Sequence, residues 1–402
     1  MAHLDSNVAR FTVAHKIFLV VIVPLLVLGL IESFCRILNL ESVFKKDAQA
    51  IALEMPAWMQ KEKNTSIKTA SVAADKDALE WLSMFEEGSG FRVRLIPGIE
   101  RRIVNTFSQI PADREYRYLV RANSLGFRGP EIETVKDPAV FRIMIFGDSS
   151  SFGWGVDQEI TFSSRLESLL SKSLNRRVEV ANFAIPGDSS EYGRLIFDRF
   201  SPQFEYDMII LGFGANDAKH SFFSHQSQVE NFKANAAAQK LKAAARSSAL
   251  FRTIENLLSS SPSSSTEAKD LPAKKPAVPK RRYVENLEYM ARAALERGAR
   301  QAMLISLCTP SGYASAAGSL AEEKGYLYFN GQRYLLKQIP IIASGDLYPE
   351  VVSEMRASYP DELKREELFY VTSDSCHPNK LGHLLLADRI AQIITSSAQT
   401  VL

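Results

Sequence analysis

The sequence predicts an α/β protein with a mainly parallel, five-stranded sheet, helices on both faces and an apolar helix near the N-terminus. Three observations predict it. Short apolar runs typical of buried strands alternate with longer segments whose apolar residues recur at helical spacing. Polar, glycine-containing motifs begin where several of these runs stop, as expected at the carboxyl ends of parallel strands. Finally, Ile17–Ile31 is a long uncharged run near the N-terminus.

Five apolar runs are expected to form the strands, because each is short and bounded by polar or turn-forming residues. In chain order they are Phe141–Phe146, Val178–Ile185, Asp207–Phe213, Gln301–Leu307 and Leu368–Val371. Four segments between and after them are expected to be helical: Ser163–Leu174, Glu191–Phe200, Tyr283–Arg297 and Lys380–Thr395. The first helix has an apolar face that is expected to pack on the sheet, made of Leu166, Leu169, Leu170 and Leu174.

Composition divides the chain into a tail at 1–16, a membrane anchor at 17–40, a polar stalk at 41–80 and a globular domain at 81–402. Within that domain, 220–280 interrupts the alternation of strands and helices. It is expected to begin as an alanine-rich helix and to continue as a Ser-, Pro- and Lys-rich segment too polar to bury a core. An insertion of this kind after the third strand fits a lid or a spacer.

The apolar run favours a single transmembrane helix, although a span needs about 20 residues and Ile17–Ile31 is shorter. Lys16 and Arg36 at its ends can snorkel, and Glu32 can be tolerated near the interface. The competing interpretation is a cleaved signal peptide, but no small-x-small cleavage site follows the run. Positive charges on the two sides are balanced. A short N-terminal tail commonly stays inside, so we expect the globular domain on the extracytoplasmic side of the cell membrane.

Charge and cysteine content exclude several classes of function. The 48 basic and 46 acidic residues nearly cancel, so no net field favours nucleic acid as a partner. Three cysteines cannot make a disulfide framework, and none has a metal-ligand spacing. Cys35 adjoins the apolar run, and the sequence leaves a bridge between Cys308 and Cys376 open.

Ser149 is the candidate nucleophile. It ends the first strand in the motif Gly147-Asp148-Ser149, where Gly147 lets the backbone turn sharply. Alone, Gly-Asp-Ser is ordinary turn chemistry. The chain repeats the same four letters at Gly187–Ser190, but that copy follows Ile185-Pro186 and is expected to open a helix. Only the first copy directly follows an apolar strand, so Ser149 is preferred to Ser189.

Two further residues are candidate donors to a negatively charged oxygen. Gly187 lies in a loop after the second strand and, lacking a side chain, can offer its N–H at close range. Asn216 follows the third strand in Gly214-Ala215-Asn216-Asp217, where its side-chain amide can be another donor. In isolation, Gly187 can also be a plain loop glycine, and for Asn216 an Asx-turn or helix cap is an equally good interpretation.

Asp374 and His377 stand three residues apart just before the last helix. In a tight loop this spacing lets a carboxylate accept from one ring nitrogen while the other faces the serine. His383 is the main competitor, but it lies inside the predicted helix and lacks an adjacent carboxylate. A zinc site from Asp374, His377 and His383 has no recognised spacing, so no metal or cofactor is expected.

Taken in order, these motifs resemble the SGNH (GDSL-type) hydrolase family, which is named for the serine, glycine, asparagine and histidine of its four blocks. The resemblance covers about residues 120–397 without the insertion, and implies a three-layer α/β/α sandwich of flavodoxin-like type. The segment Asn123–Glu131 also looks like a bacterial, membrane-anchored sub-group of the family. Ala184 stands where the second block often has glycine, and the insertion is long, which puts substrate access in doubt.

The resemblance assigns roles to the candidate residues. It implies Ser149 as the nucleophile, His377 as the base and Asp374 as the group that orients the base. The oxyanion hole would consist of the Ser149 and Gly187 N–H groups with the Asn216 amide. Asp148, although it stands beside the serine, would then be structural.

The function that follows is a membrane-anchored serine esterase acting on a small or polysaccharide acyl ester, with acetyl as the expected acyl group. The same triad also serves an O-acyltransferase that delivers the acyl group to a sugar hydroxyl of a cell-surface polysaccharide. A third interpretation is a non-catalytic scaffold in the cell envelope. It is weakened because Ser149 and His377, which a degenerate member usually loses, are both present.

Overall fold

A computed structural model describes residues 18–38, 40, 83–87, 92–104, 117–234, 241, 244–245, 247–258, 273–344, 347–358, 369–370 and 376–401. The predicted tail at 1–16 and the stalk at 41–80 lie outside these residues. The chain forms two compact units. One combines Met1–Glu54 with Asn235–Leu271, and the other combines Met55–Ala234 with Pro272–Leu402.

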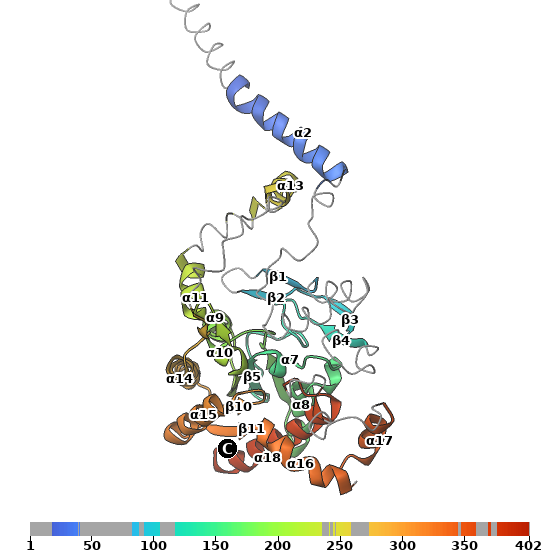
Figure 1. Ribbon diagram of the computed structural model, residues 1–402, viewed down its shortest axis with the longest axis vertical. Helices are drawn as coiled ribbons and strands as arrows, with labels where there is room; N and C mark the ends of the chain where they lie inside the picture. Colours follow the sequence, from blue (N-terminus) through green and yellow to red (C-terminus); the bar gives the residue numbers. More distant parts are fainter. Residues whose placement is uncertain are drawn as a thin grey trace, which may run out of the picture. The chain divides into compact units, whose positions relative to one another are not determined.

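The second unit is built on a five-stranded sheet in which every strand pairs parallel with its neighbours (Figure 1). Its strands are β5 (Phe141–Gly147), β6 (Val178–Asn182), β7 (Met208–Gly212), β10 (Gln301–Ser306) and β11 (Leu327–Asn330). They lie in the order β11-β10-β7-β5-β6. Numbered along the chain from the other edge, this is the 2-1-3-4-5 order of flavodoxin-like sheets. The predicted parallel, five-stranded sheet is confirmed.

One predicted strand is wrong. The run at 368–371 is described only at Phe369 and Tyr370, where Tyr370 makes an isolated antiparallel bridge with Pro378. Both side chains are buried in the core. The residues are therefore apolar because they are buried, although they do not belong to the sheet. The fifth strand is β11 instead. It has four residues on a sheet edge, three of them only half-buried, which leaves a weak apolar signal.

Helices cover both faces of the sheet, as predicted. The step from β5 to β6 runs in one direction along the sheet and all later steps run in the other, so right-handed crossovers place their helices on opposite faces. One layer contains α8 (Phe162–Ser173), α16 (Gly331–Ser344) and α18 (Lys380–Val401). The other contains α9 (Ser190–Phe200), α14 (Lys280–Glu296) and α15 (Ser311–Lys324). Within each layer the helices pack on one another: α18 on α8 and α16, and α14 on α9 and α15.

The predicted apolar face of α8 is confirmed. Leu166 and Leu170 are fully buried, and Leu169 and Leu174 pack against the same core. Across from them lie Ile143 and Ile145 of β5, together with side chains of α18. This core fixes the end of β5, from which the candidate nucleophile projects.

Shorter elements surround the sheet. Before β5 lie two antiparallel pairs, β1 (Phe85–Glu87) with β2 (Val93–Leu95) and β3 (Glu100–Val104) with β4 (Arg117–Arg121). The remaining elements of this unit are α7 (Ser149–Phe152), η3 (Gln158–Ile160), η4 (Ser201–Gln203), α10 (Ala215–Ala218), β8 (His220–Ser221), α11 (His225–Ala234), β9 (Lys275–Pro276) and α17 (Pro349–Ser358). Side chains of the two antiparallel pairs form a small core with Phe152, Trp154 and Ala184. The N-terminal strands therefore brace the loops at the carboxyl edge of the sheet.

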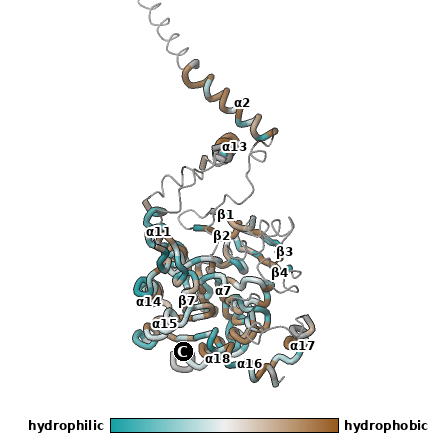
Figure 2. The backbone as a smooth tube through the Cα atoms, viewed as in Figure 1, coloured by the Kyte–Doolittle hydropathy of each residue, from teal (hydrophilic) through white to brown (hydrophobic). Residues whose placement is uncertain are grey.

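The first unit contains η1 (Phe18–Ile22), α2 (Val23–Ile37) and α13 (Ala249–Leu258). Val20–Ile37 is the one stretch of the described chain that is long and apolar enough to cross a membrane, with a mean hydropathy of 2.2. Figure 2 shows its apolar character along most of α2. A signal sequence near the N-terminus meets the same criteria of length and composition.

Candidate active site

The segment around Ser149 is a tight turn between β5 and α7. Gly147 ends the strand, Asp148 caps the helix by accepting a 2.9 Å hydrogen bond from the Ser150 amide, and Ser149 is the first helical residue. A side chain on Gly147 would place a Cβ 2.7 Å from the carbonyl oxygen of Gly212, so the turn needs glycine here. Ser149 therefore stands at the carboxyl edge of the sheet, next to β7 and β6.

Ser149 and His377, which lie 228 residues apart in the chain, meet at this edge. The Ser149 Oγ and the His377 Nε2 are 2.8 Å apart, a hydrogen-bond distance. The His377 side chain is fully buried, and Ser149 is 6% exposed. A serine hydroxyl bonded to an imidazole is the contact that lets the ring take up the hydroxyl proton. Asp374 lies outside the described residues, so its role stays a prediction.

A disulfide holds the backbone beside His377. Cys376 is joined to Cys308, which follows β10, with their Cα atoms 4.6 Å apart. The Cys376 carbonyl oxygen also accepts a 3.1 Å hydrogen bond from the Ser150 Oγ. The bridge that the sequence left open is thus formed, and it connects the histidine loop to the residues that follow β10. The Ser150 hydrogen bond connects the same loop to the serine turn.

The two candidate oxyanion donors lie on neighbouring loops. Gly187 has a φ of +81°, a backbone conformation that side chains rarely adopt, and it is half-buried. The loop stays attached to the serine strand, because the Ile185 amide donates to the Gly147 carbonyl at 3.0 Å. Asn216, in α10, donates from its Nδ2 to the carbonyl oxygen of Asp188 at 3.0 Å. The second and third motifs are therefore hydrogen-bonded to each other.

Arg92, which the sequence gave no reason to select, clamps the Gly187 loop. Its Nη2 donates to the Pro186 carbonyl and to Asp188 Oδ1, both at 2.9 Å. Burial raises the pKa of Asp188 to about 6, and the Arg92 guanidinium opposes that rise. Because Arg92 comes from the β1–β2 region, no short-range pattern connects it with residue 187.

Arg128 holds the segment that follows Ser149. It is buried, and its guanidinium donates to the carbonyl oxygens of Leu119 at 2.8 Å, Val156 at 2.6 Å and Phe152 at 3.2 Å. A further bond goes to the Gly153 carbonyl. Its signal was present in the sequence as the Asn123–Glu131 segment, which resembled a sub-group of the family but suggested no contact. In the structure, Arg128 positions the backbone that follows Ser149.

Three buried carboxyl groups surround the two serine-containing motifs. Burial raises the pKa of Asp148 to about 6 and that of Asp217 to about 7. Hydrogen bonds oppose the rise, since Asp217 accepts from the Ser190 amide at 3.0 Å. Asp188 is the third member, and the negative charge of Asp148 adds to the rise in the pKa of both Asp188 and Asp217. The region thus favours protonated, neutral carboxyl groups more than a surface would.

His383 is a structural residue in this fold. It is fully buried and stacks on Phe162, and its Nδ1 accepts a 3.1 Å hydrogen bond from the Phe162 amide. Burial lowers its pKa to about 3, so the ring is neutral. It therefore fixes the start of α8 against α18.

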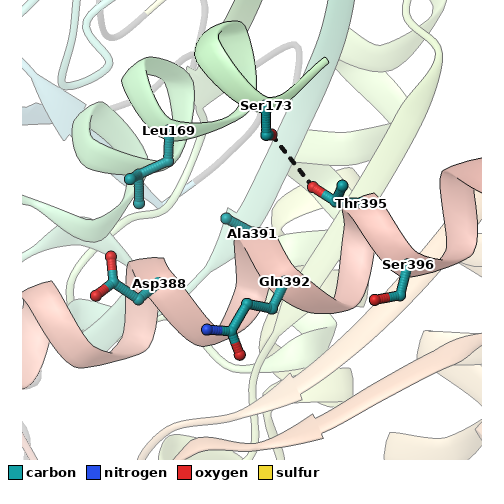
Figure 3. A pocket seen from close by; sticks show the side chains of 7 residues that line it. All are labelled: Leu169, Ser173, Asp388, Ala391, Gln392, Thr395 and Ser396. Atoms are coloured by element: carbon teal, nitrogen blue, oxygen red, sulfur yellow. Dashed lines mark hydrogen bonds between the residues drawn. The ribbon is translucent and has the colours of Figure 1, made fainter.

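Neither a metal cluster nor the described pocket adds to the site. Within the described ranges, no three His, Cys, Asp or Glu side chains are grouped so as to hold a metal ion. A pocket of about 360 Å³ opens between α8 and α18 (Figure 3). It is lined by Leu169, Ser173, Asp388, Ala391, Gln392, Thr395 and Ser396. None of these belongs to the motifs at the carboxyl edge.

A flavodoxin-like parallel sheet with a serine–histidine contact at its carboxyl edge defines a class of enzyme, the three-layer α/β/α hydrolases. The GDSL-like lipase/acylhydrolase family model matches residues 145–385, a range that includes the end of β5, the other four strands of the sheet and all four motifs. The chain belongs to this family and is an ester-hydrolysing enzyme.

Solved structures similar to the chain carry matching descriptions. An esterase, EstA, from Pseudoalteromonas sp. is 16% identical, covering 64% of this chain and 98% of its own at a TM-score of 0.36. TesA is 14% identical over 65% and 99%, at 0.36. A lipase/acylhydrolase from Enterococcus faecalis is 17% identical over 64% and 96%, at 0.34. With TM-scores this low, the assignment rests on the family model. No curated protein matches the chain.

Proposed function

We propose that this protein is a membrane-anchored serine esterase that hydrolyses acyl esters on the extracytoplasmic side of the cell membrane. The observation that supports it most directly is the 2.8 Å contact between Ser149 Oγ and His377 Nε2 at the carboxyl edge of the sheet. Ser149 is the nucleophile, His377 the general base and Asp374 the carboxylate that orients the imidazole.

In the acylation step, the Ser149 oxygen attacks the ester carbonyl carbon while its proton moves to His377 Nε2. The carbonyl π bond opens and the carbonyl oxygen becomes an oxyanion. When the tetrahedral intermediate collapses, the bond to the alcohol oxygen breaks and His377 returns the proton to the leaving alcohol. In the second step, water gives a proton to His377 and attacks the acyl carbon. When this second tetrahedral intermediate collapses, the bond to the Ser149 Oγ breaks, His377 returns the proton to that oxygen, and the acid leaves.

The oxyanion is held by the Ser149 and Gly187 N–H groups and by the Asn216 Nδ2. The left-handed backbone at Gly187 supports this role, because a residue without a Cβ lets the substrate oxygen approach. The Asn216 amide has two N–H bonds, one of which goes to Asp188. The second is then available for substrate.

Two features support the location. Val20–Ile37 has the length and composition of a membrane span. The Cys308–Cys376 disulfide lies in the catalytic unit, and disulfides persist in oxidising compartments outside the cytoplasm. Acetyl esters, including those of surface polysaccharides, are the proposed substrates because of the family resemblance and this location.

The first experiment treats the full-length protein in detergent with a fluorophosphonate probe and, separately, with a chromogenic acetyl ester. Ser149→Ala is the test variant. Ser189→Ala is the matched control, because it removes the same hydroxyl from the same four-letter motif. Labelling and turnover that vanish in Ser149→Ala and persist in Ser189→Ala are the expected result.

Other outcomes separate the alternatives. Wild-type turnover in Ser149→Ala would refute the assignment of the nucleophile. Labelling without turnover would point to an acyltransferase that awaits its acceptor, since both enzymes form the same acyl-serine. A reporter enzyme fused to the C-terminus, active only outside the cytoplasm, tests the membrane orientation on its own.

A further inference from the structure

Glu32 is a carboxylate within the apolar stretch Val20–Ile37, and three of its hydrogen bonds come from the insertion. It accepts from the Ala249 amide at 2.9 Å, the Leu250 amide at 2.9 Å and the Ser248 Oγ at 2.7 Å. The two amides belong to the first turn of α13, where backbone N–H groups have no partner within their own helix, and Ser248 immediately precedes that helix. A carboxylate at a helix N-terminus also matches the positive end of the helix dipole.

Arg36, a positively charged residue of the same helix, also joins α2 to the residues just before α13. Its Nε donates to Glu32 Oε1 at 2.6 Å, and its Nη2 donates to the Ser247 carbonyl at 2.9 Å. The two charged residues that break the apolar run near its end are therefore paired with each other and with the start of α13. In a segment that enters a membrane, charged groups need partners of this kind.

The two faces of α13 have different surroundings. Ala249 and Thr253 are buried, with 1% and 9% of their surface exposed, in a helix that packs on α2. Leu250, Ile254 and Leu257 follow at helical spacing on another face, where Ile254 is 45% and Leu257 51% exposed. Figure 2 shows α13 as one of the apolar segments of the chain. On this apolar face Leu250 is half-buried, whereas Ile254 and Leu257 are exposed.

The apolar face of α13 lies beside a helix that exposes apolar residues of its own. Phe34 and Ile37, in the last turns of α2 next to Glu32 and Arg36, are 57% and 81% exposed. A surface that continues from a membrane span onto a neighbouring amphipathic helix fits one medium, the boundary between lipid headgroups and acyl chains.

We infer that α13 is an interfacial membrane helix, capped by Glu32 of the anchor, whose Leu250–Ile254–Leu257 face rests against the acyl chains of the bilayer. The inference depends on the proposed anchor and extends it. Because α13 belongs to the insertion, the enzyme is tied to the bilayer at two points of its sequence, the N-terminal anchor and the middle of the catalytic domain. The lid or spacer expected from the sequence thereby becomes a second membrane contact.

The test uses the full-length protein in lipid vesicles, in a Cys35→Ala background so that the disulfide-bonded cysteines remain and no native thiol reacts. Single cysteines at Ile254→Cys, Leu257→Cys and, as the control on a different face, Arg252→Cys are labelled with an environment-sensitive fluorophore. Quenching by acyl-chain-brominated phosphatidylcholine is then measured. We expect several-fold stronger quenching at 254 and 257 than at 252.

A second variant tests the capping contact. Glu32→Ala removes every acceptor oxygen of that side chain, so α13 should detach and quenching at 254 should fall to the level of the 252 label. Glu32→Gln keeps one side-chain acceptor and should retain part of the quenching. Retention of the protein in the membrane after an alkaline wash should be unchanged in both, because α2 stays apolar.

The outcomes distinguish this inference from the proposed anchor. A protein that the wash removes has no anchor, and then both proposals fail. An anchored protein with equal, weak quenching at all three positions would overturn the inference alone. Labels at 254 and 257 that are shielded both from water-soluble iodide and from brominated lipid would show a protein partner on this face, which also overturns it. Hydrolysis of the acetyl ester verifies that each variant is folded.

Discussion

The two Gly-Asp-Ser-Ser copies in this chain, Gly147–Ser150 and Gly187–Ser190, have identical sequences and different surroundings. In the first copy, Ser149 opens a four-residue helix and its Oγ meets His377 Nε2 at 2.8 Å. In the second copy, Ser189 is also bonded to a histidine, because its Oγ lies 2.9 Å from His225 Nδ1. Each serine thus has an imidazole partner supplied by a distant part of the chain.

The difference lies in the backbone and in the charges around it. The first glycine ends a strand, whereas Gly187 adopts φ +81° in a loop. Asp148 caps its own turn, but Asp188 forms an ion pair with Arg92. Burial lowers the pKa of His225 to about 4, with the Arg92 charge also disfavouring a second proton, so this ring is a poor base at neutral pH. The same four-residue sequence therefore contains the candidate nucleophile in the first copy, whereas in the second copy its side chains are held in a hydrogen-bonded loop.

The largest expected effect on kcat comes from replacing the serine of the first copy, and the same replacement in the second copy is its control. Ser149→Ala should lower kcat by about 10⁴-fold or more, because a nucleophile has no substitute. Ser189→Ala removes one hydrogen bond, worth about 1 kcal/mol, and should change kcat by less than about tenfold. Steady-state hydrolysis of an acetyl ester measures both. Equal losses in the two variants would mean that the copies do not differ as described.

A smaller loss is expected at the residue that connects the two copies. Asn216→Ala removes a proposed oxyanion donor and its bond to the Asp188 carbonyl, so kcat should fall about 10²–10³-fold. KM should change little if the amide acts mainly on the transition state. Asn216→Asp keeps the size but replaces the donor by a carboxylate, and should be at least as damaged. An unaffected kcat would remove Asn216 from the site.

Loss of the disulfide should lower kcat less than Ser149→Ala or Asn216→Ala does. It should act only on the first copy, because the bridge lies beside His377. Replacing both Cys308 and Cys376 by serine frees the backbone beside His377, and displacements of about 1 Å can cost about 10²-fold in rate. Stability should fall by about 2–4 kcal/mol. Dithiothreitol should bring the wild type to the kcat of the double variant, while Cys35→Ser serves as the control. A reduced enzyme with full activity would show that other contacts alone position the histidine.

The smallest expected effect is on the pH dependence of stability. It concerns the Asp217 carboxyl group, which accepts hydrogen bonds from Ser190 of the second copy. The pKa of Asp217 is raised to about 7 by burial, so the native state binds this proton more tightly than the unfolded chain. The stabilisation is full below about pH 4 and is lost as the pH rises towards 7. Asp217→Asn should therefore flatten the fall in unfolding free energy between pH 4.5 and 7.5. Denaturant titrations followed by tryptophan fluorescence measure this, and the surface variant Glu296→Gln should leave the slope unchanged.

Much of the fold was predictable because it depends on local patterns. The apolar runs that became β5, β7 and β10 are buried along almost their whole length, so hydrophobicity alone marks them. The spacing of leucines marked α8 in the same way. An edge strand such as β11 lacks this signal, and Phe369 and Tyr370 carry it without belonging to the sheet.

The residues of the candidate site also divide into those that a local pattern predicted and those that it did not. Ser149, Gly187, Asn216 and His377 were selected because each sits in a short motif at the end of an apolar run. Arg92 and Arg128 were not, since their partners are distant in the sequence and include backbone carbonyls, which any residue type can supply. The partnership of Ser189 with His225 was equally hidden, because His225 begins α11, 36 residues further along the chain, and no motif connects the two positions.

By itself, the sequence determined the class of fold, the edge of the sheet at which the site lies, and the residues that could perform the chemistry. These follow from periodicity and from the fixed direction of parallel strands, both of which are local properties. The tertiary structure decided which histidine meets which serine, that Cys308 and Cys376 are joined, and that Glu32 caps α13. Those pairings join residues separated by tens to hundreds of positions, and only packing of the whole chain brings them within hydrogen-bonding distance.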